Sequence, residues 1–203
     1  MIAVVDYGAG NLFSVLNALE YLKIPAKLTA EKTELQQADA IILPGVGAFP
    51  DAMRMLNATG LTELLREEAQ KKPFLGICLG MQMLFETSCE FEITAGLGLI
   101  PGEIVKIPDT GLKIPHMGWN QLEFNRKCPL LDGVAENDSV YFVHSYMAQT
   151  AQENVSAYCD YGVKVPALVW KNQIYGAQFH PEKSGKIGLQ MLRNFAAMAQ
   201  KAK

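Results

Sequence analysis

Apolar residues in the first half of the chain occur in short unbroken runs that alternate with runs of helical spacing. The unbroken runs are typical of buried strands and occupy residues 2–6, 26–30, 40–43 and 74–77. Helical spacing predicts helices over about 12–23, 51–57 and 61–70. This alternation of strand and helix favours a parallel sheet with helices on both faces.

The second half is richer in strands, with Gly, Pro, Asn and Asp between them. Strand-like runs occupy residues 99–107, 119–124, 140–148, 155–162, 167–171 and 173–179. Lys171 and Asn172 predict a hairpin turn, and helical spacing predicts a last helix over 187–199. The predicted fold class is therefore α/β: a central mostly parallel sheet flanked by helices, with additional antiparallel strands, in a single domain over 1–203.

The composition is ordinary for a soluble globular protein: 49% of the 203 residues are hydrophobic, 19% are charged, and the net charge is −3. No cluster of Lys and Arg forms a stripe, which argues against nucleic acid and anionic membranes as partners. Asp6 ends the first apolar run, and Pro44 breaks the longest uncharged one. We therefore expect neither a signal peptide nor a membrane anchor, and a cytoplasmic location.

The chain has four cysteines and no CxxC pair, which favours reduced thiols over disulfides. The cysteines are Cys78, Cys89, Cys128 and Cys159. None of the three histidines lies at zinc-ligand spacing from a cysteine, so we expect no metal site. The glycine motif that begins at Gly8 has Phe13 in place of the last glycine of a dinucleotide fingerprint, and no P-loop is present. No cofactor is predicted.

One cysteine lies where an apolar run gives way to helical spacing. The segment GICLG, Gly76 to Gly80, matches the nucleophile elbow G-x-S-x-G with Cys78 in place of serine. A sharp strand-to-helix turn needs very small residues two positions on either side, because larger side chains collide. The predicted helix, Leu79 to about Glu86, favours a thiolate at its N-terminus, where free N–H groups can hold an oxyanion. The alternative is that Cys78 is a small buried hydrophobic residue.

A nucleophilic thiolate needs a base, and the candidates are His116, His144 and His180. His180 ends a predicted strand and is followed by Pro181 and Glu182. In extended backbone, residues two apart lie on one side at about 6–7 Å, so Glu182 can bond one imidazole nitrogen and leave the other for sulfur. The other two histidines have no acidic residue within two positions. The alternative is that the tripeptide is only a strand end.

The segments GICLG and HPE together resemble the class I (triad-type) glutamine amidotransferases. Within that class, six segments are similar to the glutaminase subunits of imidazole glycerol phosphate synthase, and they cover nearly the whole chain in order. They are DYGAGN (6–11), LPGVGAF (43–49), GICLGMQ (76–82), PHMGWN (115–120), FVHSY (142–146) and QFHPEKS (178–184).

The resemblance implies a reaction in which Cys78 attacks the side-chain amide of glutamine, His180 carries a proton to the leaving ammonia and Glu182 orients His180. Water then releases glutamate from a thioester. The implied oxyanion hole is formed by Gly45, Val46, Gly47 and Leu79, after a peptide flip that depends on the partner. The implied glutamine-binding residues are Gln82, Glu90, Ser145 and Tyr146. The implied positions near the partner and the ammonia exit are Trp119, Asn120, Tyr141 and Lys183, for which core packing of the two aromatic residues and a solvated lysine are the alternatives.

The two motifs take up a single domain and leave no room for a synthase module. Because ammonia in neutral water is mostly ammonium, which is not nucleophilic, an amidotransferase of this size needs a partner chain. The resemblance implies a (β/α)8-barrel cyclase subunit in a heterodimer, joined by an ammonia channel, in histidine biosynthesis. The alternatives are the glutaminase subunit of another amidotransferase, a non-catalytic regulatory binding module, and a cysteine hydrolase of other amides.

Overall fold

A computed structural model describes residues 1–201, and its centre is an eight-stranded sheet with the order β2-β1-β3-β4-β14-β13-β12-β9. The first five strands in this order are parallel, and the last three are antiparallel. The parallel strands are β1 (Ile2–Val5), β2 (Ala26–Thr29), β3 (Ala40–Gly45), β4 (Phe74–Cys78) and β14 (Ile174–Ala177). The antiparallel strands are β13 (Lys164–Lys171), β12 (Val155–Asp160) and β9 (Glu123–Phe124). The predicted fold class is confirmed.

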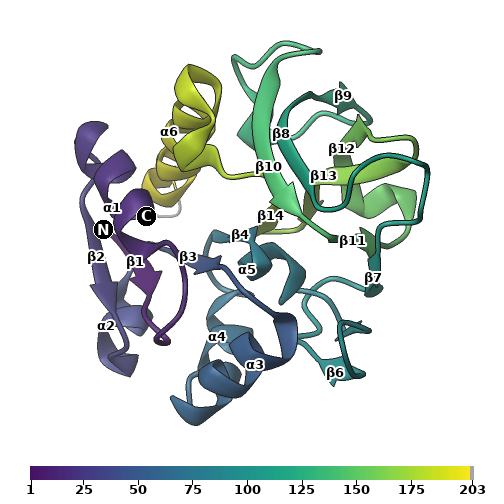
Figure 1. Cartoon of the computed structure of the whole chain (residues 1–203). Coiled ribbons are helices and arrows are strands. Elements are labelled where there is room, and N and C mark those ends of the chain that lie inside the picture. Colours follow the sequence, from purple (N-terminus) through teal and green to yellow (C-terminus); the bar gives the residue numbers. More distant parts are fainter. Residues whose placement is uncertain (202–203) are drawn as a thin grey trace.

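Helices cover both faces of this sheet (Figure 1). Helices α1 (Leu12–Tyr21) and α6 (Gly185–Lys201) share one core cluster with Ile2 and Val4 of β1. Helices α2 (Lys32–Gln37), α3 (Phe49–Ala58) and α4 (Thr62–Glu68) share the other with Ala3 and Val5. Successive side chains of a strand point to opposite faces, so an unbroken apolar run supplies both cores.

Two smaller sheets lie beside the central one (Figure 1). Strand β10 (Ser139–His144) pairs with β8 (His116–Gln121), whereas β11 (Tyr146–Gln149) belongs to a sheet with β7 (Glu103–Lys106), β5 (Thr87–Ser88) and β6 (Thr94–Ala95). The predicted single run over 140–148 is therefore two strands that separate at Ser145. This break places His144 and Tyr146 at the junction between two sheets.

Several predicted boundaries are wrong for identifiable reasons. The helix after Cys78 is α5 (Leu79–Gln82) and does not reach Glu86, because the carbonyls of residues 83–85 accept hydrogen bonds from the backbone of residues 97–100. Helix α2 was not predicted, since its six residues contain one buried apolar side chain, Leu35. The hairpin turn is confirmed near Asn172, which follows the last paired residue of β13 and has a φ of 55°.

Within the part of the chain that the structure describes there are also three short 3-10 helices: η1 (Pro129–Leu131), η2 (Gln152–Asn154) and η3 (Pro181–Lys183). Over residues 1–201, no helix is both long enough and apolar enough to cross a membrane.

Candidate active site

Cys78 lies at the junction of β4 and α5 with φ 55° and ψ −111°, which is a strained conformation for a residue with a side chain. A Cβ on Gly76 would lie 2.5 Å from the Gly80 carbonyl oxygen, and one on Gly80 would lie 1.8 Å from the Leu43 oxygen. Both contacts are too short for any side chain. The turn therefore needs both glycines, as the sequence predicts. Because α5 is one turn long, the helix contributes less positive potential to the sulfur than expected.

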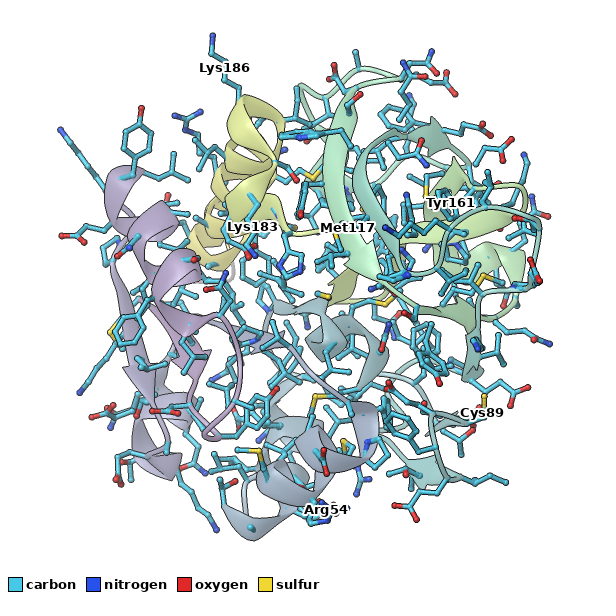
Figure 2. All side chains as sticks on the ribbon, viewed as in Figure 1. Arg54, Cys89, Met117, Tyr161, Lys183 and Lys186 are labelled. Atoms are coloured by element: carbon cyan, nitrogen blue, oxygen red, sulfur yellow. The ribbon has the colours of Figure 1, made fainter. Side chains whose placement is uncertain are left out.

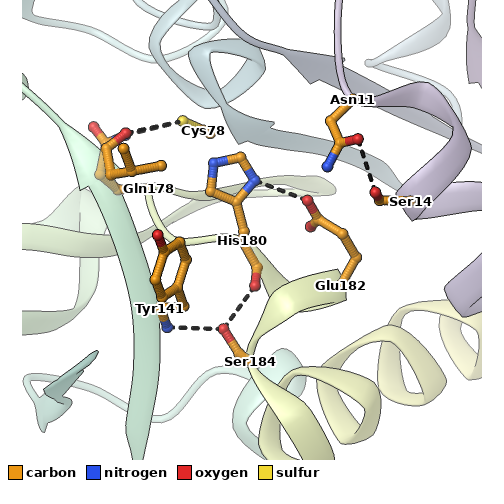
Figure 3. Close-up of polar contacts among 9 residues, drawn as sticks. Asn11, Ser14, Cys78, Tyr141, Gln178, His180, Glu182 and Ser184 are labelled. Carbon is orange, nitrogen blue, oxygen red and sulfur yellow. Dashed lines mark hydrogen bonds and ion pairs between the residues drawn. The ribbon is translucent and has the colours of Figure 1, made fainter. Parts of the chain in front are cut away.

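His180 and Glu182 form a buried pair. His180 Nδ1 lies 2.8 Å from Glu182 Oε1, and the two side chains are 2% and 1% exposed. Figure 3 shows the imidazole between Cys78 and Glu182. The second ring nitrogen, Nε2, is buried and forms no hydrogen bond within the described chain. It is therefore available to interact with the Cys78 sulfur.

The backbone that presents His180 differs from the predicted one. Strand β14 ends at Ala177, and η3 begins at Pro181, so the predictions that the strand reaches His180 and that the backbone is extended through Glu182 are wrong. The chain leaves β14 to meet β10, where His180 N donates to the Tyr141 carbonyl at 2.9 Å. Ser184 Oγ donates to the His180 carbonyl at 2.6 Å and accepts from Tyr141 N at 3.0 Å (Figure 3).

The charge of His180 follows from its neighbours. Burial alone would lower the pKa of His180, but interactions with Cys78 and then Glu182 outweigh burial and raise this pKa to about 9. The folded chain therefore favours an imidazolium at neutral pH, held between the sulfur of Cys78 and the buried side chain of Glu182.

A cavity of about 290 Å³ opens beside this pair. Nine residues singled out from the sequence line it: Val46, Gly47, Cys78, Leu79, Gln82, Glu90, Ser145, Tyr146 and His180. Pro115, Val143 and His144 also line it. The sequence assigned no role to Pro115 or Val143 and named His144 only as an alternative base. Gly45 and Glu182 lie outside this lining. The cavity is large enough for an amino acid and has acceptors and donors on several sides.

Gln82 is 4% exposed and has a fixed amide orientation. Its Nε2 donates to the Tyr146 carbonyl at 3.1 Å and to Gln178 Oε1 at 3.0 Å. Both amide hydrogens are thus used, and the side-chain oxygen of Gln82 is the remaining acceptor. Gln178, which is fully buried, lies with Nε2 4.0 Å from Cys78 Sγ.

Glu90 contributes a carboxylate to the cavity. One oxygen, Oε2, accepts from Phe49 N at 2.8 Å, at the first turn of α3. Burial raises the pKa of Glu90, and the Phe49 hydrogen bond opposes that change. The other oxygen has no partner within the described chain, which leaves it available to an ammonium group.

The segment after β3 provides backbone close to Cys78. Gly45 is the register partner of Cys78, whereas Val46 is 42% exposed and Gly47 has a φ of 100°. A Cβ on Gly47 would meet nothing within 4 Å, so this glycine is not held by packing. No side chain at Gly47 therefore restrains the backbone of this segment.

All four positions predicted near the partner lie on three adjoining elements, β8, β10 and η3. Trp119 and Tyr141 are opposite each other in β8 and β10 with ring centroids 6.1 Å apart, and Lys183 is exposed in η3 (Figure 2). Trp119 is 59% exposed and reaches within 4.0 Å of a Cβ placed on Gly185. The Asn120 side chain points to the other face of β8, where it donates to the Asp160 carbonyl at 2.8 Å.

Sequence reasoning missed residues whose roles depend on distant partners. Asn11, which accepts from Ser14 Oγ at 2.7 Å, lies beside Glu182 in Figure 3. Gln178 and Cys78 are 100 positions apart in the sequence, and no local sequence pattern predicts their contact. Among residues 1–201 there is also no group of three or more His, Cys, Asp or Glu side chains suited to a metal ion.

Comparison with known proteins places these residues in a family context. A family model described as glutamine amidotransferase class-I matches residues 3–199. A protein from Shouchella clausii (strain KSM-K16), named imidazole glycerol phosphate synthase subunit HisH, is 50% identical over 206 residues, covering 98% of this chain and 99% of the relative. A protein of the same name from Listeria innocua serovar 6a is 49% identical over 205 residues, covering 100% and 98%.

Solved structures agree on the fold. A crystal structure of a glutamine amidotransferase matches with a TM-score of 0.76 at 18% identity, covering 98% of this chain and all (100%) of that one. PurLQS from Thermotoga maritima matches with a TM-score of 0.74 at 21% identity, covering 96% of each chain.

Proposed function

The chain belongs to the class I glutamine amidotransferase family, and we propose that it is the glutaminase subunit of an imidazole glycerol phosphate synthase. It hydrolyses glutamine to glutamate and ammonia and passes the ammonia to a cyclase subunit in histidine biosynthesis. The supporting observation is the geometry of one site: Cys78 on a strained turn, beside an imidazole that is paired with a buried carboxylate.

The first half of the reaction forms a thioester. The Cys78 thiolate attacks the side-chain amide carbon of glutamine, and the C–S bond forms while the carbonyl oxygen becomes an oxyanion. The imidazolium of His180, whose pKa is about 9, gives its proton to the amide nitrogen. The C–N bond then breaks and ammonia leaves. Glu182 accepts a hydrogen bond from Nδ1 throughout and so holds the ring in place.

The second half returns the enzyme to its starting state. Neutral His180 takes a proton from a water molecule, whose oxygen attacks the thioester carbon. The C–S bond breaks, glutamate leaves, and the thiolate–imidazolium pair is restored. In the proposal, backbone N–H groups of Gly45, Val46, Gly47 and Leu79 hold the two oxyanions after the exposed segment rotates.

The cavity residues hold the rest of the substrate. Glu90 Oε1 accepts from the α-ammonium group of glutamine, and Gln82 presents its free side-chain oxygen. Ser145 and Tyr146, at the junction of β10 and β11, also line the cavity, and the Tyr146 carbonyl accepts a hydrogen bond from Gln82.

The partner in this proposal is a cyclase subunit with a (β/α)8-barrel fold, and the two chains form a heterodimer around an ammonia channel. The chain itself acts as one domain in the cytoplasm. Trp119, Tyr141 and Lys183, which lie on adjoining elements, face the partner. Asn120 acts from the inner face of the same strand.

The test is glutamate release from free glutamine, with and without a cyclase subunit and its ribonucleotide ligand. The proposal expects release that rises with the partner, a thioester detectable by mass spectrometry after acid quench, and loss of both in Cys78→Ala. Continued turnover by Cys78→Ala would overturn the mechanism. Normal partner binding without any thioester would instead support a regulatory module, and activity confined to γ-glutamyl peptides would support a hydrolase of other amides.

A further inference from the structure

Two buried histidines have no part in the reaction described above. His116 and His144 are 2% and 6% exposed, and His116 Nδ1 lies 3.0 Å from His144 Nε2. His144 lines the glutamine cavity, whereas His116 lies behind it on β8. The His116 ring is stacked between Phe142 and Tyr161, with centroids 4.7 and 4.0 Å away.

The hydrogen bonds of this pair have one possible direction. His144 Nδ1 lies 2.8 Å from the Tyr146 carbonyl, which can only accept, so Nδ1 carries the hydrogen and Nε2 of the neutral ring accepts. His116 must then donate through Nδ1, and its Nε2 accepts from Asn120 Nδ2 at 3.3 Å. Burial lowers the pKa of His116 to about 4 and that of His144 to about 3, so both rings are neutral at pH 7.

The chain of hydrogen bonds continues into the cavity. The Tyr146 carbonyl that accepts from His144 also accepts from Gln82 Nε2. Gln82 in turn donates to Gln178, which approaches Cys78. The position of Gln82 therefore depends on the position of a carbonyl that His144 holds.

The other end of this series of hydrogen bonds lies on β8, a strand with an exposed outer face. Met117 and Trp119 are 60% and 59% exposed on one face of β8, while His116 and Asn120 point inward. Strand β8 pairs with β10 along six residue pairs from Ser139–Gln121 to His144–His116, so a shift of β8 moves both ends of the histidine pair together. Figure 1 shows these two strands side by side, apart from the central sheet.

We propose that His116 and His144 are positioning residues that form a neutral hydrogen-bonded relay from β8 to the Tyr146 carbonyl, and that this relay couples partner docking on β8 to the geometry of the glutamine cavity. The inference rests on the proposed function, since it assigns the regulation of that same site. The relay moves no proton. It transmits position, because each nitrogen has a fixed role as donor or acceptor.

The first test determines the tautomers of the two histidines and does not depend on enzyme activity. Nitrogen-15 NMR of histidine-labelled protein distinguishes Nδ1–H from Nε2–H tautomers. The relay requires Nδ1–H on both His116 and His144 at pH 7. A protonated ring or an Nε2–H tautomer at either position would overturn it.

The second test compares matched variants in the complex at saturating partner. His144→Phe removes the donor to Tyr146 and is expected to raise the KM for glutamine about tenfold. His144→Asn can keep that donor through its amide nitrogen, so KM stays near the unmodified value, but its link to His116 is lost. His116→Phe keeps the aromatic stack and loses both hydrogen bonds. For His144→Asn and His116→Phe we expect partner stimulation of kcat to fall about tenfold.

A purely structural role would not produce this split between KM and stimulation. Equal KM values for His144→Phe and the unmodified protein, or full stimulation in His116→Phe, would overturn the relay. Failure of the proposed function looks different, because the unmodified protein would then release no glutamate with the partner.

Discussion

Cys78, the residue expected to react, also has a strained backbone conformation. A φ of 55° in a residue with a Cβ costs of order 1–2 kcal/mol and persists only where the surroundings enforce it. Here the enforcement comes from Gly76 and Gly80, whose missing side chains let α5 approach β3 and β4. The strain aims the sulfur at the cavity, where His180 also lies.

The pH dependence of activity should report the proton on His180. Because Cys78 and Glu182 raise the pKa of His180 to about 9, the imidazolium is present below that pH and is lost above it. The value of kcat/KM for glutamine should therefore fall as pH rises through about 9. In Glu182→Gln the neutral amide no longer favours the imidazolium, so the alkaline limb should move to lower pH by at least about one unit.

The control for this pH profile is Glu153→Gln. Glu153 is an exposed glutamate in η2, and the substitution removes the same charge at a position outside the site. Its alkaline limb should match that of the unmodified protein. A limb that stays in place in Glu182→Gln would mean that another group controls it.

At the scale of elements, the elbow depends on how closely α5 packs against β3. In Gly80→Ala the new Cβ would lie 1.8 Å from the Leu43 carbonyl oxygen, a backbone atom that cannot move without disturbing β3. We expect the free energy of unfolding to fall by at least about 3 kcal/mol in urea titrations. Gly111→Ala is the matched control: its φ is 79°, but a Cβ there meets nothing within 4 Å. Its cost should be about 1 kcal/mol, and equal losses would contradict the packing argument.

Two adjacent lysines that follow α4, Lys71 and Lys72, form ion pairs with the carboxylate of Glu68. We expect their substitutions to lower the free energy of unfolding by different amounts. Lys72 Nζ is 2.7 Å from Glu68 and donates to the carbonyls of Leu35 and Gln36, at the end of α2. Lys71 also pairs with Glu68, at 2.9 Å, but its side chain is 59% exposed against 11% for Lys72. Burial alone raises the pKa of Glu68, and hydrogen bonds from Lys72 and Lys71 outweigh burial and lower it.

Lys72→Met should therefore cost about 3 kcal/mol of unfolding free energy, since it leaves a buried carboxylate and two carbonyls short of a partner. Lys71→Met should cost much less than Lys72→Met, as expected for an exposed ion pair that solvent screens. Urea unfolding of the two single variants measures the difference. Similar losses in both would show that Glu68 is not a buried anchor for α2.

At the scale of the whole molecule, local chemistry was predictable and long-range pairing was not. The GICLG spacing carries its own steric requirement, so the elbow around Cys78 could be predicted from neighbouring residues alone. The early end of α5 depends on residues 97–100, and the break at Ser145 depends on pairing with β7 and β8. The partners of His144 and Gln178 likewise come from distant elements, and periodicity contains no signal for them.

The outer face of β8 carries the aromatic residue that we propose to meet the partner. Trp119 exposes 59% of its surface on β8, close to Tyr141 and to the start of α6, although large aromatic side chains are usually buried. Exposed aromatic residues of this kind supply much of the binding energy in protein interfaces. We expect Trp119→Ala to weaken binding of the cyclase subunit at least about thirtyfold in calorimetric titration.

Tyr21→Ala is the matched control for that loss. Tyr21 is 74% exposed and ends α1. Because α1 connects the parallel strands β1 and β2, its last residue lies toward the N-terminal end of these strands, whereas the elbow lies at the C-terminal end of β4. Partner affinity should be unchanged in this variant, and both variants should keep the unfolding free energy of the unmodified chain. If Tyr21→Ala weakened binding and Trp119→Ala did not, the partner would dock at the N-terminal end of the parallel strands. Ammonia would then have to pass along the length of the central sheet to reach it, which the packed cores on both faces do not permit.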